Sequence, residues 1–299
     1  ILEEEIAKRS PGFDKPLLVF EHQQASSERV LLETAIRDTV LGLIDANQLE
    51  RAEAPISKLS IGVECGASDG FSGISANPAI GRCADLLVAT GGKAILSEFP
   101  ELCGVEQELI DRCVDAATAE KFITLMRAYA SRAEAVGSAL HMNPSPGNIR
   151  DGLITDAIKS AGAARKGGTS PVVDAIDYPG VATRPGLTLL CTPGNDVEST
   201  TALAGAHANL ILFSTGLGTP TGNAVTPVIK VSSNTTVAER HRDMIDFDAG
   251  PIIEGAQSID QTGQNLLELC LDVASGETPT KASLLGQNDF LPWKRGVSL

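Results

Sequence analysis

The hydrophobic positions of this chain form two kinds of pattern. Short apolar runs, such as LSIGV at 59–63, are typical of buried strands, whereas residues 28–48 space most of their apolar side chains as an amphipathic helix does. The predicted strands are 16–22, 59–64, 93–98, 187–194 with its turn, 209–216 and 226–231. The predicted helices are 28–48, 77–90, two within 106–140, 152–164, 197–206, one capped near Ser233 or Asn234, and 258–275.

Several helix ends are marked by their residue types. Asn77 is a good N-cap and Pro78 suits the first helical position, while Gly276 is a good stop for the last helix. The segment HMNPSPGN at 141–148 is predicted to be a loop, because a proline disfavours helix in the residue before it.

The order of strands and helices predicts an α/β fold. Strands that alternate with helices form a parallel sheet covered by helices, so we expect Rossmann-like, three-layer segments. The pattern recurs in two parts of the chain, with a helical, loop-rich region between them. We therefore divide the chain into a first α/β segment at 1–105, a connecting region at 106–184 and a second α/β segment at 185–299.

Polar loops follow the predicted strands. The most conspicuous is ECGASDGFSGISANPAIG at 64–81, which combines a thiol, a carboxylate and hydroxyls with four glycines. Ligands of open parallel sheets bind at the carboxyl ends of the strands. We expect the turns beginning at Cys65, Glu98, Thr192 and Thr215 to form one pocket, with glycines that let backbone N–H groups approach a ligand. Polar residues of these turns also include Glu101 and Asp196.

Composition and charge argue against several classes of function for this protein. The net charge of −14 and the aromatic content of 4% argue against nucleic-acid binding. No apolar run has the length of a membrane span and no signal peptide is visible, so we expect a cytoplasmic protein without a membrane partner. The six cysteines include no C-x-x-C pair, which argues against a structural zinc site.

Individual residues also have structural interpretations. Cys65 could be a small buried side chain, and Glu98 could merely cap a turn. The glycines of TGLGTPTGN at 215–223 miss the spacing of a dinucleotide-binding loop. Neither H-E-x-x-H nor G-x-S-x-G occurs in the chain.

Five motifs in order, ECGASDGFSGISANPAIG, SEFPE, NPSPGN, KGGTSP and TGLGTPTGN, resemble the altronate dehydratase/galactarate dehydratase family. LSEFPE-x-C-G, MNPSPGN and the terminal DFLPWKRGVSL are most similar to its altronate branch. The resemblance covers residues 15–299. Members of that family also carry a small β-rich N-terminal domain, so we expect this chain, which starts at Ile1 within a helical pattern, to be the C-terminal catalytic portion.

The resemblance implies a hydro-lyase that removes water from a sugar acid, D-altronate in the altronate branch, to give 2-dehydro-3-deoxy-D-gluconate. It also implies Fe²⁺, Mn²⁺ or another divalent metal. The C2 proton next to a carboxylate is poorly acidic, so an enediolate must be stabilised as it forms, which a chelated cation does. A base must remove that proton and an acid must protonate the departing 3-hydroxyl.

On this chemistry we assign candidate roles. Cys65, Asp69 and Glu98 are candidate metal ligands. The candidate catalytic residues are Lys159, Lys166, Asp69 and Glu98, with base and acid not distinguished. The candidate substrate-binding residues are Ser68, Ser72, Asn77, Asn143, Ser145, Asn148, Thr192, Thr215, Gly216 and Gly218.

Other functions remain open on the sequence. A galactarate dehydratase or the large subunit of a sulfolactate lyase would use the same site loops. A non-catalytic nucleotide-binding α/β module is the rival from another class, and TGLGTPTG is its best support. An iron–sulfur dehydratase would need about three thiolates, such as those of Cys65, Cys103 and Cys191, to meet. We expect a homo-oligomer.

Overall fold

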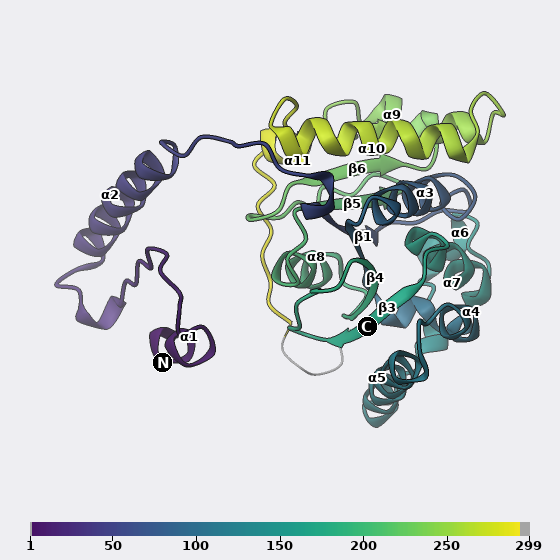
Figure 1. The fold of residues 1–299 in the computed structure, drawn as a ribbon, viewed down its shortest axis with the longest axis horizontal. Coiled ribbons are helices and arrows are strands. Elements are labelled where there is room, and N and C mark those ends of the chain that lie inside the picture. Colours follow the sequence, from purple (N-terminus) through teal and green to yellow (C-terminus); the bar gives the residue numbers. More distant parts are fainter. Residues whose placement is uncertain (1, 294–299) are drawn as a thin grey trace. The chain divides into compact units, whose positions relative to one another are not determined.

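A computed structural model of the chain describes residues 2–293 and shows an α/β fold (Figure 1). Its contacts divide the chain into two units, residues 1–53 and 54–299. The predicted boundaries at 105 and 184 therefore both fall inside the second unit. Within residues 2–293 no helix is both long and apolar enough to span a membrane.

The described part of the first unit, residues 2–53, contains two α-helices, α1 (Leu2–Arg9) and α2 (Glu28–Ala46), and a short 3₁₀ helix, η1 (His22–Gln24). Helix α2 confirms the helix predicted at 28–48 and begins where the Ser27 hydroxyl accepts a hydrogen bond from the Val30 N–H. The predicted strand at 16–22 is wrong. Its residues adopt no strand structure because no strand is described within residues 2–53 with which they could form a ladder.

In residues 54–293 the second unit is built on one sheet of seven parallel strands in the order β3-β4-β2-β1-β5-β6-β7. This confirms the predicted parallel α/β architecture. The predicted strands at 59–64, 93–98, 187–194, 209–216 and 226–231 all occur, with slightly different ends. The observed bounds are β1 Ser60–Cys65, β2 Lys93–Leu96, β3 Val172–Asp177, β4 Gly186–Cys191, β5 Leu210–Thr215, β6 Val228–Ser232 and β7 Phe247–Asp248.

Strands β3 and β7 were not predicted. Strand β3 lies at one edge of the sheet, and its burial is intermittent, whereas the central strands β1 and β4 are buried throughout. Its sequence VVDAID carries acidic residues that interrupt the apolar run. Strand β7 has two residues, which is too short for a periodic signal.

Helices cover both faces of the sheet, giving three layers. Alternate residues of the strands separate into two cores: Leu187 and Leu189 of β4 join one, and Leu190 joins the other. The larger core lies under α3, α5 and α10, and the smaller lies under α8 and α11. The α-helices of this unit are α3 Ala76–Ala89, α4 Glu106–Asp111, α5 Ala116–Ala135, α6 Pro146–Arg150, α7 Asp156–Ala164, α8 Asp196–Gly205, α9 Thr235–Arg240, α10 Ile259–Ser275 and α11 Lys281–Leu284.

The structure differs from two local predictions. The loop predicted at 141–148 contains the start of α6, because Pro146 takes the first helical position and Ser145 caps it with Asn148 in a capping box. Helix α3 begins at Ala76, after Ser75, two residues before the predicted first helical position at Pro78, so Asn77 lies inside the first turn. The other predicted helices occur with ends that differ by a few residues, including the stop at Gly276, whereas α11 was not predicted.

Candidate active site

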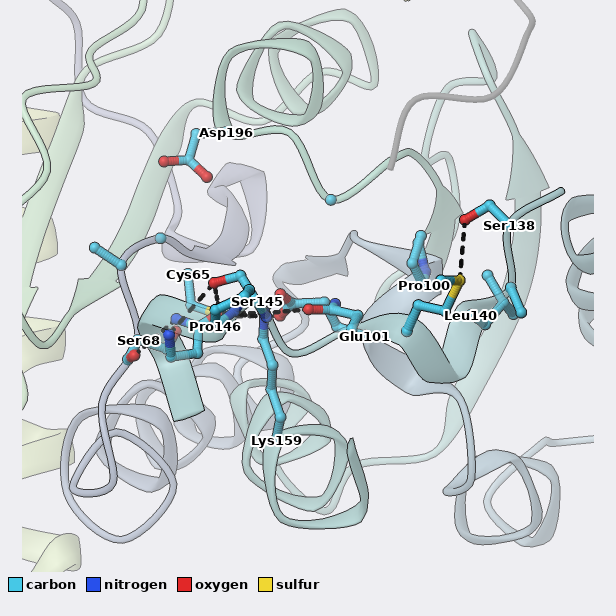
Figure 2. Close-up of a pocket in the computed structure, with 17 residues that line it drawn as sticks. Cys65, Ser68, Pro100, Glu101, Ser138, Leu140, Ser145, Pro146, Lys159 and Asp196 are labelled. Carbon is cyan, nitrogen blue, oxygen red and sulfur yellow. Dashed lines mark hydrogen bonds and ion pairs between the residues drawn. The ribbon is translucent and has the colours of Figure 1, made fainter. Parts of the chain in front are cut away.

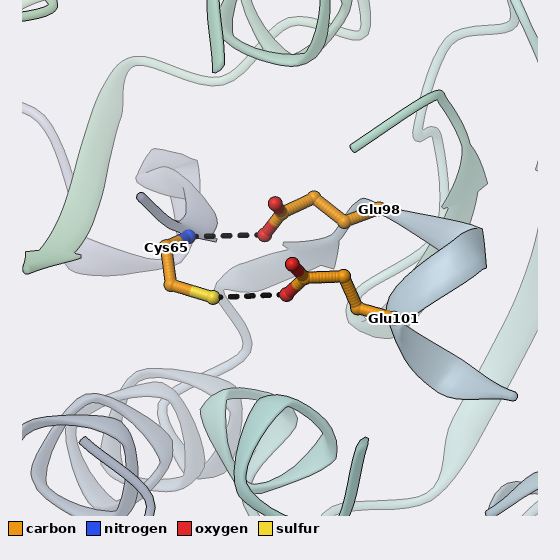
Figure 3. A group of neighbouring side chains, drawn as sticks. All are labelled: Cys65, Glu98 and Glu101. Atoms are coloured by element: carbon orange, nitrogen blue, oxygen red, sulfur yellow. Dashed lines mark hydrogen bonds between the residues drawn. The ribbon is translucent and has the colours of Figure 1, made fainter. Parts of the chain in front are cut away.

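The site is built where β1 and β2 end. Cys65 is the last residue of β1, and the chain leaves β2 through Glu98, which adopts a left-handed backbone conformation, into the 3₁₀ helix η3 (Phe99–Leu102). Residues three apart lie on the same side of a 3₁₀ helix. Glu98 and Glu101, at the start and within this turn, both direct their carboxylates toward Cys65 (Figure 3).

Cys65, Glu98 and Glu101 form a compact group of possible ligand atoms. The Glu98 Oε2 accepts the Cys65 backbone N–H at 3.0 Å, and the Cys65 Sγ lies 3.1 Å from the Glu101 Oε2. One ligand atom from each residue lies within 4.8 Å of the other two. All three side chains are buried.

Lys166 adds a positive charge to this buried group. It lies in the 3₁₀ helix η5 (Arg165–Gly167), is fully buried, and places its Nζ 2.5 Å from the Glu98 Oε2 and 2.8 Å from the Cys65 Sγ. Although burial opposes the charge, the neighbouring thiol and carboxylates raise the pKa of Lys166. Lys166 is therefore held as an ammonium ion and is not poised to act as a base.

The pKa values of the three acidic side chains in this group are shifted in different directions. Burial, followed by the charge of Glu101, raises the pKa of Glu98 to about 7 despite the neighbouring Lys166. Burial also raises the pKa of the Cys65 thiol well above its usual range. For Glu101 burial acts in the same direction, but the charges of Lys159 and Lys166 outweigh it and lower its pKa. The group thus combines the ionised carboxylate of Glu101 with two possible metal ligands, the Glu98 carboxyl and the Cys65 thiol, whose pKa values are raised.

Close packing of glycines brings η5 to the site. A Cβ at Gly81 of α3 would lie 2.0 Å from the Arg165 carbonyl oxygen, and one at Gly73 would lie 3.0 Å from the Cα of Gly162. Side chains at either position would push away the segment that carries Lys159 and Lys166. We predicted that glycines of the 64–81 loop admit a ligand, whereas Gly73 and Gly81 admit a neighbouring chain segment.

Lys159, in α7, forms the next part of the site. Its Nζ lies 2.7 Å from the Glu101 Oε1, 2.8 Å from the Asn143 Oδ1 and 3.3 Å from the Asn148 Oδ1. Asn148 also donates its Nδ2 to the Ser68 carbonyl oxygen at 3.0 Å. Burial opposes the charge of Lys159, but Glu101 and its other acidic neighbours raise its pKa. Lys159 is a second ammonium ion.

These residues line a cavity of about 520 Å³ (Figure 2). Asp196, the first residue of α8, lies across the cavity from Lys159 and Glu101. Burial, then the charge of Glu101, raises the pKa of Asp196 to about 6. The cavity lining is Cys65, Gly66, Ala67, Ser68, Pro100, Glu101, Ser138, Ala139, Leu140, Met142, Asn143, Ser145, Pro146, Asn148, Lys159, Gly194 and Asp196.

Asp69 belongs to a different polar cluster. Its Oδ1 accepts hydrogen bonds from the Ser72 hydroxyl and the Ser233 hydroxyl, both at 2.8 Å, and its Oδ2 accepts from the Asn234 Nδ2 at 3.1 Å. Backbone N–H groups of Phe71 and Ser72 add to these. Asp69 therefore ties the 64–81 loop to the end of β6, and it is not part of the Cys65 ligand group. We had grouped it with Cys65 and Glu98, and the structure separates it from them.

Several predicted substrate-binding residues do not line the cavity. The Thr192 side chain is fully buried and accepts the Glu98 N–H. Asn77 donates to the Gly162 carbonyl and accepts from the Ser214 hydroxyl. The others outside the lining are Ser72, Thr215, Gly216 and Gly218. Ser68, Asn143, Ser145, Asn148 and Lys159 do line it.

Glu101 and Asp196 were given no role from the sequence, although both were noted at strand ends. The spacing of Glu98 and Glu101 in SEFPE was the available signal, since it places two carboxylates on one side of a tight turn. For Asp196 there was no comparable signal. Only the packing of α8 beside β1 places its carboxylate over the cavity.

The rival interpretations find less support in this geometry. In the described part of the chain, the group with metal-ligand geometry contains one cysteine, so three thiolates do not meet. In TGLGTPTGN, the Gly218 N–H donates to the Thr215 Oγ1 and the Gly222 N–H donates to Asp289. These N–H groups are used within the protein and do not face the cavity.

The Cys65 group fits a divalent cation. Its donors are a thiol sulfur and two carboxylates, and the buried Glu98 Oε1 has no hydrogen-bond partner among the described residues. A buried oxygen of this kind requires a partner, which a cation would provide. Thiolate with carboxylate ligands suits a transition metal such as Fe²⁺ better than Ca²⁺ or Mg²⁺.

Comparison with known proteins gives a consistent result. The family described as D-galactarate/Altronate dehydratase, C-terminal, matches residues 56–298. The chain is 42% identical over 253 residues to the altronate dehydratase of Escherichia coli (strain K12) and 39% identical over 253 residues to that of Bacillus subtilis (strain 168). Each match covers 84% of this chain and 50% of the relative, so the chain spans about half the length of these proteins. The galactarate dehydratase (L-threo-forming) of E. coli is 35% identical, over 82% of this chain and 47% of its own length.

Proposed function

The chain belongs to the D-galactarate/altronate dehydratase family, and from this premise we propose that its cavity is the catalytic centre of a sugar-acid dehydratase. This membership confirms the resemblance noted in the sequence. The proposed reaction converts D-altronate into 2-dehydro-3-deoxy-D-gluconate, because the two altronate dehydratases are more similar to the chain than the galactarate dehydratase is. The observation that carries the proposal is the cavity lined by Cys65 and Glu101 of the Cys65 group together with Lys159 and Asp196.

The reaction requires a C–H bond and a C–O bond to break. The proton at C2 moves to a base, the hydroxyl at C3 leaves with a proton as water, and the resulting enol becomes the 2-keto acid. The proton taken at C2 balances the proton delivered to the leaving hydroxyl. The difficult step is the first, since it generates charge next to an existing carboxylate.

Cys65, Glu98 and Glu101 are the residues that would hold the metal, for which Fe²⁺ and Mn²⁺ are the candidates. When bound, the cation would act as a Lewis acid toward the carboxylate and the 2-hydroxyl of the substrate. Lys166 lies against the Cys65 Sγ and the Glu98 Oε2, so its ammonium limits the negative charge that the ligands accumulate. Glu101 replaces Asp69 in this set because Asp69 is fully engaged elsewhere.

Asp196 is the proposed base for the C2 proton. It is a carboxyl group that lines the cavity, and its pKa of about 6 leaves it mostly ionised at neutral pH while keeping it a stronger base than an exposed carboxylate. Lys159, on the other side of the cavity, is the proposed proton donor to the departing hydroxyl, because it is a charged donor that lines the cavity. Hydroxyl groups further along the substrate would be bound by Ser68, Asn143, Ser145 and Asn148.

The test uses the intact protein as its gene encodes it. Purified enzyme is assayed with altronate, galactarate and sulfolactate, before and after chelation and again after Fe²⁺ or Mn²⁺ is restored. Asp196→Asn is expected to lower kcat with altronate about 10³-fold while leaving the metal content unchanged. The matched control, Asp243→Asn, changes an exposed aspartate and should have wild-type turnover.

Three results would contradict the proposal. Turnover that survives complete chelation would remove the metal from it. Wild-type turnover in Asp196→Asn would remove the proposed base. A clear preference for galactarate or sulfolactate would keep the dehydratase or lyase centre but replace the substrate.

A further inference from the structure

We infer that Thr192 is a positioning residue for the metal site, because its hydroxyl holds Glu98 in the backbone conformation that presents the Glu98 carboxylate to Cys65 and Lys166. This inference rests on the proposed function only in taking Glu98 as a metal ligand. Thr192 follows β4, the neighbour of β2, so it reaches the site from outside the segments that supply the ligands.

Glu98 adopts a backbone conformation that favours glycine. Its φ is 67° and its ψ is 58°, in the left-handed region that residues with a Cβ seldom occupy. With this conformation at the start of η3, the Glu98 carboxylate reaches the Cys65 N–H at 3.0 Å and the Lys166 Nζ at 2.5 Å. An unfavourable conformation at a candidate ligand requires surrounding contacts that impose it.

Thr192 supplies those contacts with two of its groups. Its Oγ1 accepts the Glu98 N–H at 2.8 Å, and its carbonyl oxygen accepts the Phe99 N–H at 3.2 Å. Two consecutive N–H groups of the turn are thereby fixed to one residue. Because Thr192 and Glu98 are both fully buried, water cannot readily replace the hydroxyl if it is removed.

Further hydroxyl groups orient the Thr192 hydroxyl itself. Its hydrogen can point to the Pro193 carbonyl at 3.0 Å or to the Ser199 Oγ at 3.3 Å, which leaves a lone pair for the Glu98 N–H. The Ser199 hydroxyl in turn donates to the Ser97 Oγ at 2.9 Å. A row of buried hydroxyl groups thus connects α8 to the residue before Glu98.

Two substitutions separate the hydroxyl from the shape of the side chain. Thr192→Val keeps the shape but leaves the Glu98 N–H without its acceptor, whereas Thr192→Ser keeps the acceptor. Thr188→Val is the matched control: Thr188 lies in β4, is 1% exposed, and its Oγ1 has no hydrogen-bond partner in the described part of the chain. The control makes the same chemical change four residues earlier, within the strand that leads to Thr192, at a side chain that has no hydrogen bond to Glu98.

The first measurement is the affinity of metal-free, intact protein for Mn²⁺ by calorimetric titration. We expect Thr192→Val to raise the Kd by 10- to 100-fold, as is usual when a group that orients a metal ligand is lost. Thr192→Ser and Thr188→Val should stay within about threefold of wild type. If Thr192→Val does not fold, as judged by thermal unfolding, Thr192→Ala replaces it and the same shift is expected.

The second measurement does not depend on metal. Crystal structures of metal-free wild type and Thr192→Val, or of Thr192→Ala in its place, give the Glu98 φ and the distance from its carboxylate to the Lys166 Nζ. We expect φ to leave the left-handed region and the carboxylate to move away from Lys166. An unchanged Glu98, or an unchanged Kd in a protein that binds Mn²⁺, overturns the inference. A wild-type protein that binds no Mn²⁺ or Fe²⁺ overturns the metal part of the proposed function instead, and the crystal structures still decide the role of Thr192.

Discussion

Lys166 and Lys230 are both fully buried lysines of the second unit, yet they have opposite surroundings. Lys166 contacts a thiol and a carboxylate at the candidate site, and its pKa is raised. Lys230, in β6, donates its Nζ to the Gln287 Oε1 at 2.6 Å, and burial lowers its pKa to about 8 although Asp246 and Asp289 oppose the shift. The first lysine compensates buried acids, while the second is a buried charge bound to a neutral amide.

The comparison shows that burial alone does not identify a functional lysine. The partners decide whether the charge is stabilised or opposed. Asp69 makes the same point for acids: it is buried and well bonded, whereas the nearby Glu98 keeps one oxygen without a partner among the described residues. At the candidate site, Glu98 has an oxygen without a hydrogen bond and lies beside the compensating charge of Lys166. Both carboxylate oxygens of Asp69 accept hydrogen bonds, which is typical of a structural contact.

The largest effect is expected from Lys166→Met. Removing the ammonium leaves Cys65, Glu98 and Glu101 without their nearest compensating charge, so we expect kcat to fall about 10³-fold. The free energy of unfolding should fall by about 3–5 kcal/mol, since an uncompensated acid would remain buried. Steady-state kinetics and urea unfolding measure the two changes. Near-wild-type values of both would show that the Lys166 ammonium is not needed to compensate the buried acids, and would contradict the comparison.

A smaller effect is expected from Asp69→Asn. The new amide NH₂ would face the Asn234 Nδ2, a donor, so at least one buried hydrogen bond and the charge that strengthens the others are lost. We expect the free energy of unfolding to fall by about 2–3 kcal/mol. Metal content should not change, because Asp69 is outside the ligand group.

Urea unfolding and metal analysis of the folded protein test this prediction. Asp111→Asn, at an exposed position of α4, is the control for the amide substitution itself. Loss of metal from folded Asp69→Asn would return Asp69 to the metal site and contradict the separation of the two clusters.

The smallest effect concerns the pH dependence that Lys230 gives to stability. Its pKa is about 8 in the folded protein and about 10.4 in an unfolded chain, so between these values the unfolded state binds more protons. Stability should therefore rise as the pH increases from 8 to 10, by about 1–3 kcal/mol, and the full penalty of the buried ammonium is present below pH 8. The measurement is the difference in unfolding free energy between wild type and Lys230→Met at each pH. A difference that is constant from pH 7 to pH 10 would contradict this account.

Much of the fold could be predicted from the sequence, because the residue patterns that indicate strands and helix ends are local. The central strands are buried on both faces, so each reads as an uninterrupted apolar run, and Ser258 and Gly276 mark the ends of α10 by their own chemistry. The failures occurred where a local pattern depends on a distant partner. The run at 16–22 is apolar but has no strand beside it, and β3 is a strand because β4 pairs with it despite its acidic residues.

By itself, the sequence determined the parallel α/β class, the family motifs and the position of polar residues at strand ends, since these follow from periodicity and from residue types close together in the chain. Only the tertiary structure decided which of those residues meet. It brought Cys65, Glu98, Glu101 and Lys166 into one buried group, placed Asp196 and Lys159 across a cavity, and assigned Asp69 and Thr192 to holding neighbouring backbone in place. The physical reason is that contacts between residues 33 to 101 positions apart, such as Cys65 with Glu98 and with Lys166, depend on how helices pack on the sheet, and no local pattern records that packing.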